Sequence, residues 1–409
     1  MKRLALFLFA LMTLPATGQT RSLTISGISS GGFMASQMAT IYSDQFSGVA
    51  TVAGGVFFCA QNVFQNNLSA YGQAAYFNYG VNAAGHNTPS ILEPLESNPL
   101  YQALGVCMQH PEKAHQNEAA KTASAQPMNL DFLNDFVTKQ LIADTSNISE
   151  QRVLIYQGTN DETVRAGMAD RLQEFYTRLG ATGNQLKMVF SEGNHNFPTL
   201  REDGIPCAEA KPPYIANCKI DLAGQILTHL LNRNLVRSKF NEHNFHVVSQ
   251  TKGPDSVASY GYLYANPLCL NKPSACDLHV ALHGCKMSDS FDKNFQAAYE
   301  AKVQLTRVLN IQDYELKARS PKMGALAFAK KAGYAEYAEA SANHLMVFFP
   351  QTQITSDNYP ANPNGCWDWY GWTGKEYATN QGSEPSWLIQ QINAIKKNPR
   401  ALLLQEIPQ

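Results

Sequence analysis

The sequence lacks the features that mark membrane-spanning, nucleic-acid-binding and modular proteins. The longest apolar run covers residues 4–14, and no stretch of the 409 residues is long and apolar enough to cross a bilayer. The formal net charge is only -1, which gives no reason to expect a nucleic-acid partner. The chain has no Gly/Ser, Pro/Thr or charged linker, no internal repeat and no low-complexity tract. We therefore expect a globular, monomeric protein with no nucleic-acid partner and no membrane anchor.

The N-terminus has the three parts of a secretory signal peptide. Residues 1–3 are basic at two positions, residues 4–14 are apolar, and residues 16–18 are small enough for cleavage just before Gln19. The apolar run is too short to span a bilayer, so it is not an anchor. We expect residues 1–18 to be removed and residues 19–409 to be secreted to an extracellular or periplasmic space.

The cysteines do not have the spacing of a metal or redox site. There are eight of them and no CxxC pair, which disfavours a zinc or dithiol centre. His279 and His283, four residues apart on an expected strand, are separated by roughly 13 Å and cannot share a metal ion. No metal or cofactor is expected.

In an exported chain the eight cysteines instead predict four disulfides, for which sequence alone allows 105 pairings. Local spacing favours two pairs and leaves four cysteines open: Cys207 with Cys218, Cys269 with Cys276, then Cys59, Cys107, Cys285 and Cys366.

A Gly-x-Ser-x-Gly motif centred on Ser29 stands between an expected strand at residues 23–25 and an expected helix at residues 33–42. In a nucleophile elbow the serine occupies a sharp, strained strand-to-helix turn, where the glycines avoid side-chain clashes. Its hydroxyl then lies at a helix N-terminus, where the dipole favours developing negative charge. The alternative is a turn of small residues that merely caps a helix, because such short matches often arise by chance.

Two further residues follow expected strands in the order of a catalytic triad. Asp161 comes after a strand at residues 152–158, and His195 comes after a strand at residues 185–191. Alone, Asp161 could be the N-cap of the next helix, and His195 could be a solvated loop residue. With Ser29 they give the chain order Ser, Asp, His of α/β-hydrolases. Serine needs a base to activate it, and the base needs an acid to fix its tautomer, so we predict this triad.

An oxyanion hole needs one backbone N–H from the residue after the nucleophile and one from another loop. Ser30 follows Ser29 and would supply the first. A strand expected over residues 278–285 ends in a His-Gly-Cys loop, so the amide of Cys285 would supply the second.

The strand order predicts an α/β-hydrolase fold that is circularly permuted. Too few residues precede Ser29 to form the strands that usually come before the nucleophile. Further strands are instead expected after His195, at residues 244–249, 260–264, 278–285 and 345–350, and a helix at residues 294–308. We expect one catalytic domain over residues 19–409, with insertions at about residues 61–149 and 304–343.

An aromatic segment lies near the C-terminus. Residues 362–372 read NPNGCWDWYGW and hold three of the four tryptophans of the chain. Such a segment can be a buried structural cluster. It can also form an aromatic rim that grips an apolar or ring-bearing substrate, which makes Trp367 and Trp369 candidate substrate-binding residues.

Taken together, these motifs resemble those of secreted poly(3-hydroxybutyrate) depolymerases of the circularly permuted, single-domain α/β-hydrolase type. The matching segments are residues 26–34, 158–161, 195–199, 214–218, 261–264, 278–285 and 362–372. The resemblance implies that Ser29 is the nucleophile, that His195 is its base and that Asp161 orients His195. It also implies that the amides of Ser30 and Cys285 form the oxyanion hole. It also implies four disulfides: Cys59–Cys107, Cys207–Cys218, Cys269–Cys276 and Cys285–Cys366.

The chain departs from that family in two stretches. The segment between Cys59 and Cys107 looks longer than the compact version of the family, and residues 304–343 look like a second insertion. The chain also has no room for the linker and separate polymer-binding domain that many bacterial relatives carry.

The predicted function is a secreted serine esterase that hydrolyses poly(3-hydroxybutyrate) or a related short-chain polyhydroxyalkanoate through an acyl-enzyme. Its partner would be a polyester or oligoester substrate. The alternative within enzymes is a carbohydrate esterase, such as a feruloyl or acetyl-xylan esterase. A non-catalytic surface-binding protein is disfavoured, because every catalytic position holds the residue type that the chemistry requires.

Overall fold

The computed structural model describes residues 21–60, 101–115, 128–250, 252–290, 325–355 and 362–405. The predicted signal peptide, the predicted helix at residues 294–308 and much of both predicted insertions lie outside these residues. Among the helices that are described, none is long and apolar enough to cross a membrane.

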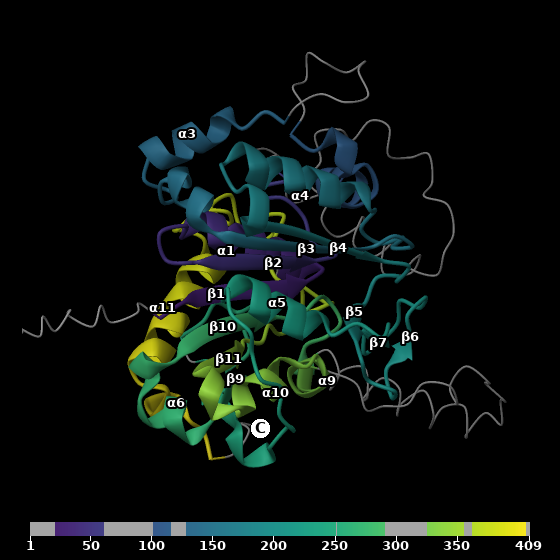
Figure 1. Ribbon diagram of the computed structural model, residues 1–409. Helices are drawn as coiled ribbons and strands as arrows, with labels where there is room; N and C mark the ends of the chain where they lie inside the picture. Colours follow the sequence, from purple (N-terminus) through teal and green to yellow (C-terminus); the bar gives the residue numbers. More distant parts are fainter. Residues whose placement is uncertain are drawn as a thin grey trace, which may run out of the picture.

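An eight-stranded sheet forms the centre of the molecule (Figure 1), with the strand order β4-β3-β2-β1-β10-β11-β9-β8. The strands are β1 (Leu23–Ile28), β2 (Gly48–Val52), β3 (Arg152–Gly158), β4 (Leu186–Ser191), β8 (Phe245–Ser249), β9 (Tyr260–Ala265), β10 (Asp277–Leu282) and β11 (Leu345–Phe349). The six strands from β4 to β11 in that order pair in parallel, whereas β9 and β8 extend the sheet by antiparallel pairing.

The first strand of the chain lies in the middle of this sheet. From β1 the chain builds outward through β2, β3 and β4 to one edge, and then forms the other half from the later strands β8 to β11. Strand β10 pairs directly with β1, so that Val280 lies opposite Ile25. The sequence prediction of a circularly permuted strand order is therefore confirmed.

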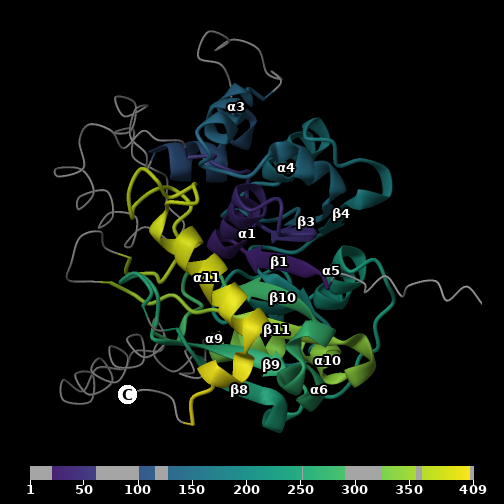
Figure 2. The same ribbon diagram turned by 90° about the vertical axis from the view of Figure 1, so that its left-hand side faces the viewer.

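Two hydrophobic layers cover the two faces of the sheet because successive strand residues point to opposite sides. Along β3, Val153 and Ile155 belong to one core cluster, and Leu154 and Tyr156 belong to the other. The first cluster includes side chains of α1 (Ser30–Ile41), α3 (Asp131–Thr138), α4 (Gly167–Arg178) and α11 (Ser383–Lys397). The second includes side chains of α5 (Leu222–Leu230), α9 (Ala325–Lys331) and α10 (Tyr334–Glu339). Figure 2 shows α1 and α11 on one side of the strands and α5 and α10 on the other.

A small three-stranded sheet stands beside the carboxyl end of β4. Its strands are β5 (Phe197–Thr199), β6 (Ile205–Pro206) and β7 (Ile215–Asn217), in the order β5-β7-β6 (Figure 1). The remaining helical segments are short: α6 (Pro267–Asn271), a π-helix (Tyr101–Gln109) and 3-10 turns at Pro111–Lys113, Thr145–Glu150, Gly183–Gln185, Glu242–Asn244, Pro273–Ala275, Ser341–Asn343 and Pro399–Leu402.

All eight cysteines form disulfides. The pairs are Cys59–Cys107, Cys207–Cys218, Cys269–Cys276 and Cys285–Cys366, which are the four pairs that the resemblance implies. Two of them matter for the candidate site. Cys207 is hydrogen-bonded to Asn194, the residue before His195, and Cys285 lies in the predicted oxyanion loop.

Candidate active site

Ser29 lies at the junction between β1 and α1 in a strained backbone conformation. Its φ is 56° and its ψ is -124°, in a region that residues with a side chain rarely adopt. The amide of Ser29 donates to the carbonyl of Val52 at 2.9 Å, and the carbonyl of Ser29 accepts from the amide of Phe33 at 3.0 Å. The turn is thus held between the neighbouring strand and the first turn of the helix, as a nucleophile elbow requires.

The two glycines of the motif are required by close backbone approaches. A Cβ atom on Gly27 would lie 2.1 Å from the carbonyl oxygen of Gly31, inside the elbow itself. A Cβ atom on Gly31 would lie 2.4 Å from the carbonyl oxygen of His283, in the loop after β10. The motif therefore does more than cap a helix, because it lets α1 start in contact with the predicted oxyanion loop.

Asp161 and His195 are hydrogen-bonded to each other at the ends of β3 and β4. The distance from His195 Nδ1 to Asp161 Oδ2 is 2.8 Å, and the two residues are only 7% and 3% exposed. Because an ionised carboxylate can only accept, the proton of the neutral imidazole lies on Nδ1. Nε2 is then free to take a proton from a hydroxyl, as a general base must.

The carboxylate of Asp161 is oriented by its own loop. Asp161 Oδ1 accepts from the amides of Thr163 and Val164, each at 2.8 Å, which leaves Oδ2 for the imidazole. Helix α4 begins only at Gly167, with Ala166 as its N-cap, so Asp161 is not the cap of that helix.

Ser29, Asp161 and His195 lie at the same end of the sheet, because β1, β3 and β4 are parallel and their carboxyl ends meet there. Within the described part of the chain, the hydroxyl of Ser29 makes no hydrogen bond, so the structure joins only Asp161 and His195 directly. Catalytic hydrogen bonds are often long in a site without substrate and shorten when it binds.

The loop after β10 lies directly against Ser29. A Cβ atom built on Gly284 would be 3.1 Å from the Cβ atom of Ser29. The predicted oxyanion donor, Cys285, is the next residue in the chain. This loop is bound to the aromatic segment by the Cys285–Cys366 disulfide and by a 2.6 Å hydrogen bond from the amide of Lys286 to the carbonyl of Asn364.

The buried ring of His283 also holds this loop. Its Nε2 accepts from the amide of Thr352 at 3.2 Å, so its proton lies on Nδ1, which is 2.8 Å from the carbonyl of Gly284. Burial lowers the pKa of His283 to about 4, so the ring is neutral at physiological pH. Nothing in the sequence singled out this role, apart from the position of His283 next to Gly284.

The tryptophans of the aromatic segment are buried. Trp367 is 0% exposed, and its amide is 3.4 Å from the hydroxyl oxygen of Ser30. Trp369 is 6% exposed and its ring stacks on Phe33 at 4.1 Å between centroids. This packing favours the buried cluster over the aromatic rim, and a contact of Trp367 or Trp369 with substrate stays a prediction.

A pair of buried carboxyl groups organises the turn after Trp367, and no pattern in the sequence predicted it. Asp368 accepts from the amides of Gly371 at 2.7 Å and Thr373 at 2.9 Å, and the amide of Asp368 donates to Glu384 at 2.8 Å. Burial, together with the nearby charge of Asp368, raises the pKa of Glu384 to about 8.

The described residues contain no group of three or more His, Cys, Asp or Glu side chains arranged to hold a metal ion. The ring of His279 is already taken up by hydroxyl groups, since it lies 2.8 Å from both Thr24 Oγ1 and Ser26 Oγ.

Comparison with known proteins identifies similar sequences. No family model matches the chain. It is 26% identical over 370 residues to a poly(3-hydroxybutyrate) depolymerase of Delftia acidovorans, over 88% of this chain and 57% of that protein. It is 24% identical over 387 residues to a polyhydroxybutyrate depolymerase of Talaromyces funiculosus, over 91% of this chain and 89% of that protein. The chain thus spans a little over half of the first relative and most of the second.

Two solved structures share the fold. One is the crystal structure of a PHB depolymerase from Penicillium funiculosum, and the other is a PHB depolymerase complexed with an R3HB trimer. Each has a TM-score of 0.63 and 23% identity, over 92% of this chain and 96% of the other. The resemblance that the sequence motifs predict is therefore confirmed, and the fold is an α/β-hydrolase fold.

Proposed function

We propose that this protein is an exported serine esterase that hydrolyses poly(3-hydroxybutyrate) or a related short-chain polyhydroxyalkanoate. The observation that carries the proposal is the buried 2.8 Å hydrogen bond between His195 and Asp161, at the same sheet edge as the strained turn of Ser29. A strained serine beside an acid-oriented histidine is the arrangement that acyl transfer requires.

In the proposed mechanism, the hydroxyl of Ser29 attacks the ester carbonyl while His195 Nε2 takes its proton. Asp161 stabilises the imidazolium and keeps the ring in the required tautomer. The amides of Ser30 and Cys285 stabilise the charge that develops on the carbonyl oxygen. His195 then protonates the leaving alcohol, and the same steps with water as nucleophile release the acid from the acyl-enzyme.

The substrate class is inferred from the relatives. Both curated relatives bear the name depolymerase, and one structural neighbour holds an R3HB trimer. These likenesses favour a polyester or oligoester substrate over the sugar esters of a carbohydrate esterase. Export is supported by the signal-peptide pattern of residues 1–18 and by four disulfides, which form in oxidising compartments.

The proposal is tested with purified protein starting at Gln19. We expect it to clear amorphous poly(3-hydroxybutyrate), to cleave 3-hydroxybutyrate oligomers, and to react with an organophosphate at Ser29 only, as mapped by mass spectrometry. Cleavage of feruloyl or acetyl sugars without cleavage of hydroxybutyrate esters would establish the alternative esterase. Absence of both labelling and hydrolysis would reject a serine esterase altogether.

A further inference from the structure

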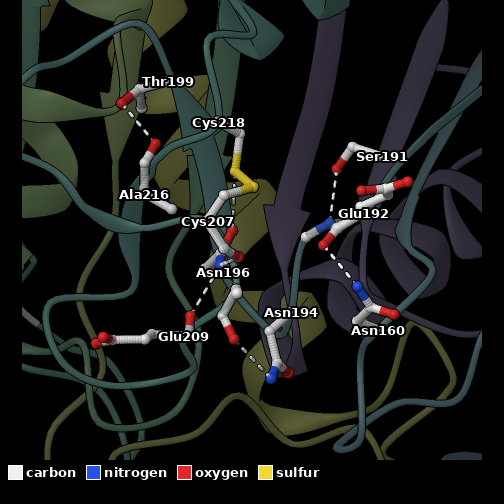
Figure 3. The surroundings of a disulfide bond; sticks show 12 residues. Asn160, Ser191, Glu192, Asn194, Asn196, Thr199, Cys207, Glu209, Ala216 and Cys218 are labelled. Carbon is white, nitrogen blue, oxygen red and sulfur yellow. Dashed lines mark hydrogen bonds between the residues drawn. A yellow bond between two sulfur atoms is a disulfide. The ribbon is translucent and has the colours of Figure 1, made fainter.

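The loop that carries His195 is fastened on both sides to one small disulfide-closed loop (Figure 3). Before the histidine, the amide of Asn194 donates to the carbonyl of Cys207 at 2.9 Å, and its side chain donates to the carbonyl of Ala208 at 3.2 Å. After the histidine, the side-chain amide of Asn196 donates to the carbonyls of Cys207 at 2.8 Å and Glu209 at 2.9 Å. His195 is thus the residue between two clamps.

Asn196 is the buried member of this arrangement. It is 0% exposed, and both protons of its side-chain amide are used on the loop of residues 207–218. Leaving a buried amide without its acceptors, or buried carbonyls without their donor, costs far more free energy than the same loss at an exposed position. The side chain of Asn196 therefore has one strongly preferred position, and it fixes the backbone next to His195.

The loop that receives these bonds is itself closed. The Cys207–Cys218 disulfide joins residues 11 apart in sequence, and β5 pairs with β7 just beyond Asn196. The amide of Phe197 donates to the carbonyl of Tyr214 at 2.7 Å, which continues the attachment. The loop to which Asn196 binds is thus fixed by a covalent bond and by strand pairing.

The imidazole of His195 depends on this backbone for its position. Apart from the bond to Asp161, no hydrogen bond holds the ring of His195 within the described residues. The carboxylate of Asp161 is held by the amides of Thr163 and Val164, which belong to its own loop. A shift of the backbone at His195 would therefore move the ring relative to this carboxylate.

We propose that Asn196 is a positioning residue for the general base, acting through the loop closed by the Cys207–Cys218 disulfide. The proposal rests on the proposed function, because it assigns His195 the role of base. Misplacement of a reacting group by about 1 Å can cost about 100-fold in rate, so loosening this clamp should lower kcat while substrate binding persists.

The test compares Asn196→Ala with a matched control, Asn343→Ala. Asn343 is also buried, at 4% exposure, and donates its side-chain amide to the carbonyls of Val236 and Tyr337, each at 2.7 Å. We expect similar losses of melting temperature in the two variants. Only Asn196→Ala should lower kcat for a small nitrophenyl ester, by about 10- to 100-fold with KM little changed, and slow organophosphate labelling of Ser29 in parallel.

A second pair of variants tests the route through the disulfide. Cys207→Ser with Cys218→Ser should lower kcat, and adding Asn196→Ala should lower it little further. Cys269→Ser with Cys276→Ser opens a disulfide elsewhere and should leave kcat unchanged. If Asn196→Ala fails to fold, Asn196→Asp is used, since it keeps the shape but cannot donate to two carbonyls when ionised.

The outcomes separate this inference from the proposed function. Equal kcat in the wild type and the Asn196 variants would overturn the positioning role, as would equal kcat losses in the Asn196 and Asn343 variants. Strictly multiplicative losses from Asn196→Ala and the opened Cys207–Cys218 pair would overturn the route through the disulfide. If the wild type neither hydrolyses esters nor reacts with the organophosphate, the proposed function fails instead.

Discussion

At the scale of single residues, the site depends on backbone conformations that small neighbours permit. Holding Ser29 at a φ of 56° costs on the order of 1–3 kcal/mol, and the surrounding contacts must supply that energy. Those contacts include the bond to Val52 and the close approach of Gly31 to His283. The strain keeps the hydroxyl at the sheet edge, where His195 and the oxyanion loop lie.

Removing the hydroxyl of Ser29 should abolish ester hydrolysis without unfolding the protein. Ser29→Ala is expected to lower kcat by about 10⁴–10⁶-fold, the scale seen when a triad serine is lost. The measurement is kcat on a nitrophenyl ester, with circular dichroism to show that the fold is intact. Full activity in a folded Ser29→Ala variant would exclude this serine as nucleophile.

The sequence points to some candidate site residues much better than to others. Ser29, Asp161 and His195 could be named because each directly follows a strand, and position after a parallel strand has a chemical meaning. His283 and Asn196 could not, because their hydrogen bonds reach residues distant in sequence, such as Thr352 and Cys207. A buried polar residue is identified by its partners, and those partners are known only once the chain has folded.

At the scale of elements, the aromatic segment and the proposed oxyanion loop are joined into one unit. Cys285 and Cys366 are 81 residues apart, and in the chain-entropy model such a link contributes on the order of 4 kcal/mol to stability. The amide of Lys286 adds a backbone bond to the same segment. The position of the proposed Cys285 donor is therefore tied to the segment that contains the tryptophans.

Opening this disulfide should loosen the oxyanion donor without removing it, because the donor is a backbone N–H. We expect Cys285→Ser and Cys366→Ser to lower kcat to a similar extent, by up to about 10²–10³-fold. The double variant should be little worse than either single one. A double-mutant cycle on kcat measures this, and strictly additive free-energy losses would contradict the coupling.

The burial of Trp369 changes what its replacement should do. Because the ring stacks on Phe33 and is 6% exposed, Trp369→Ala should cost about 3–5 kcal/mol of stability. Losses of kcat should then be equal on amorphous polymer and on a small nitrophenyl ester. Selective loss of polymer hydrolysis, with the melting temperature unchanged, would instead support a rim that contacts the substrate.

At the scale of the whole molecule, the topology could be predicted because strand signals survive a change in chain order. Strands β1, β2, β10 and β11 are buried along their whole length, and β3 is buried at every residue except Arg152, which is typical of a parallel sheet covered on both faces. The helices of the later half, such as α5 and α10, were not named in advance. Their role depends on which sheet face they cover, and sequence periodicity alone does not give that.

The stability of the whole molecule should depend on pH through the carboxyl group of Glu384, at the start of α11. Burial, with the charge of Asp368, raises the pKa of Glu384 from 4.5 to about 8 in the folded protein. Between pH 4.5 and about 8, unfolding therefore releases a proton from Glu384. The contribution of this group to the free energy of unfolding is fully present below about pH 4.5 and is lost as the pH rises toward 8. Each pH unit in this window corresponds to at most about 1.4 kcal/mol.

The matched variant for this effect is Glu384→Gln, which keeps the shape of the side chain and does not ionise. Its free energy of unfolding should change less between pH 5 and pH 8 than that of the wild type, with the two curves diverging as pH rises, since only the wild type must keep a proton on this buried group. Urea denaturation at several pH values measures the difference, and far-UV circular dichroism at pH 6 checks that both proteins share the same fold. Parallel curves across the window would show that Glu384 is ionised in the folded protein, where its carboxylate accepts from the amide of Asp368.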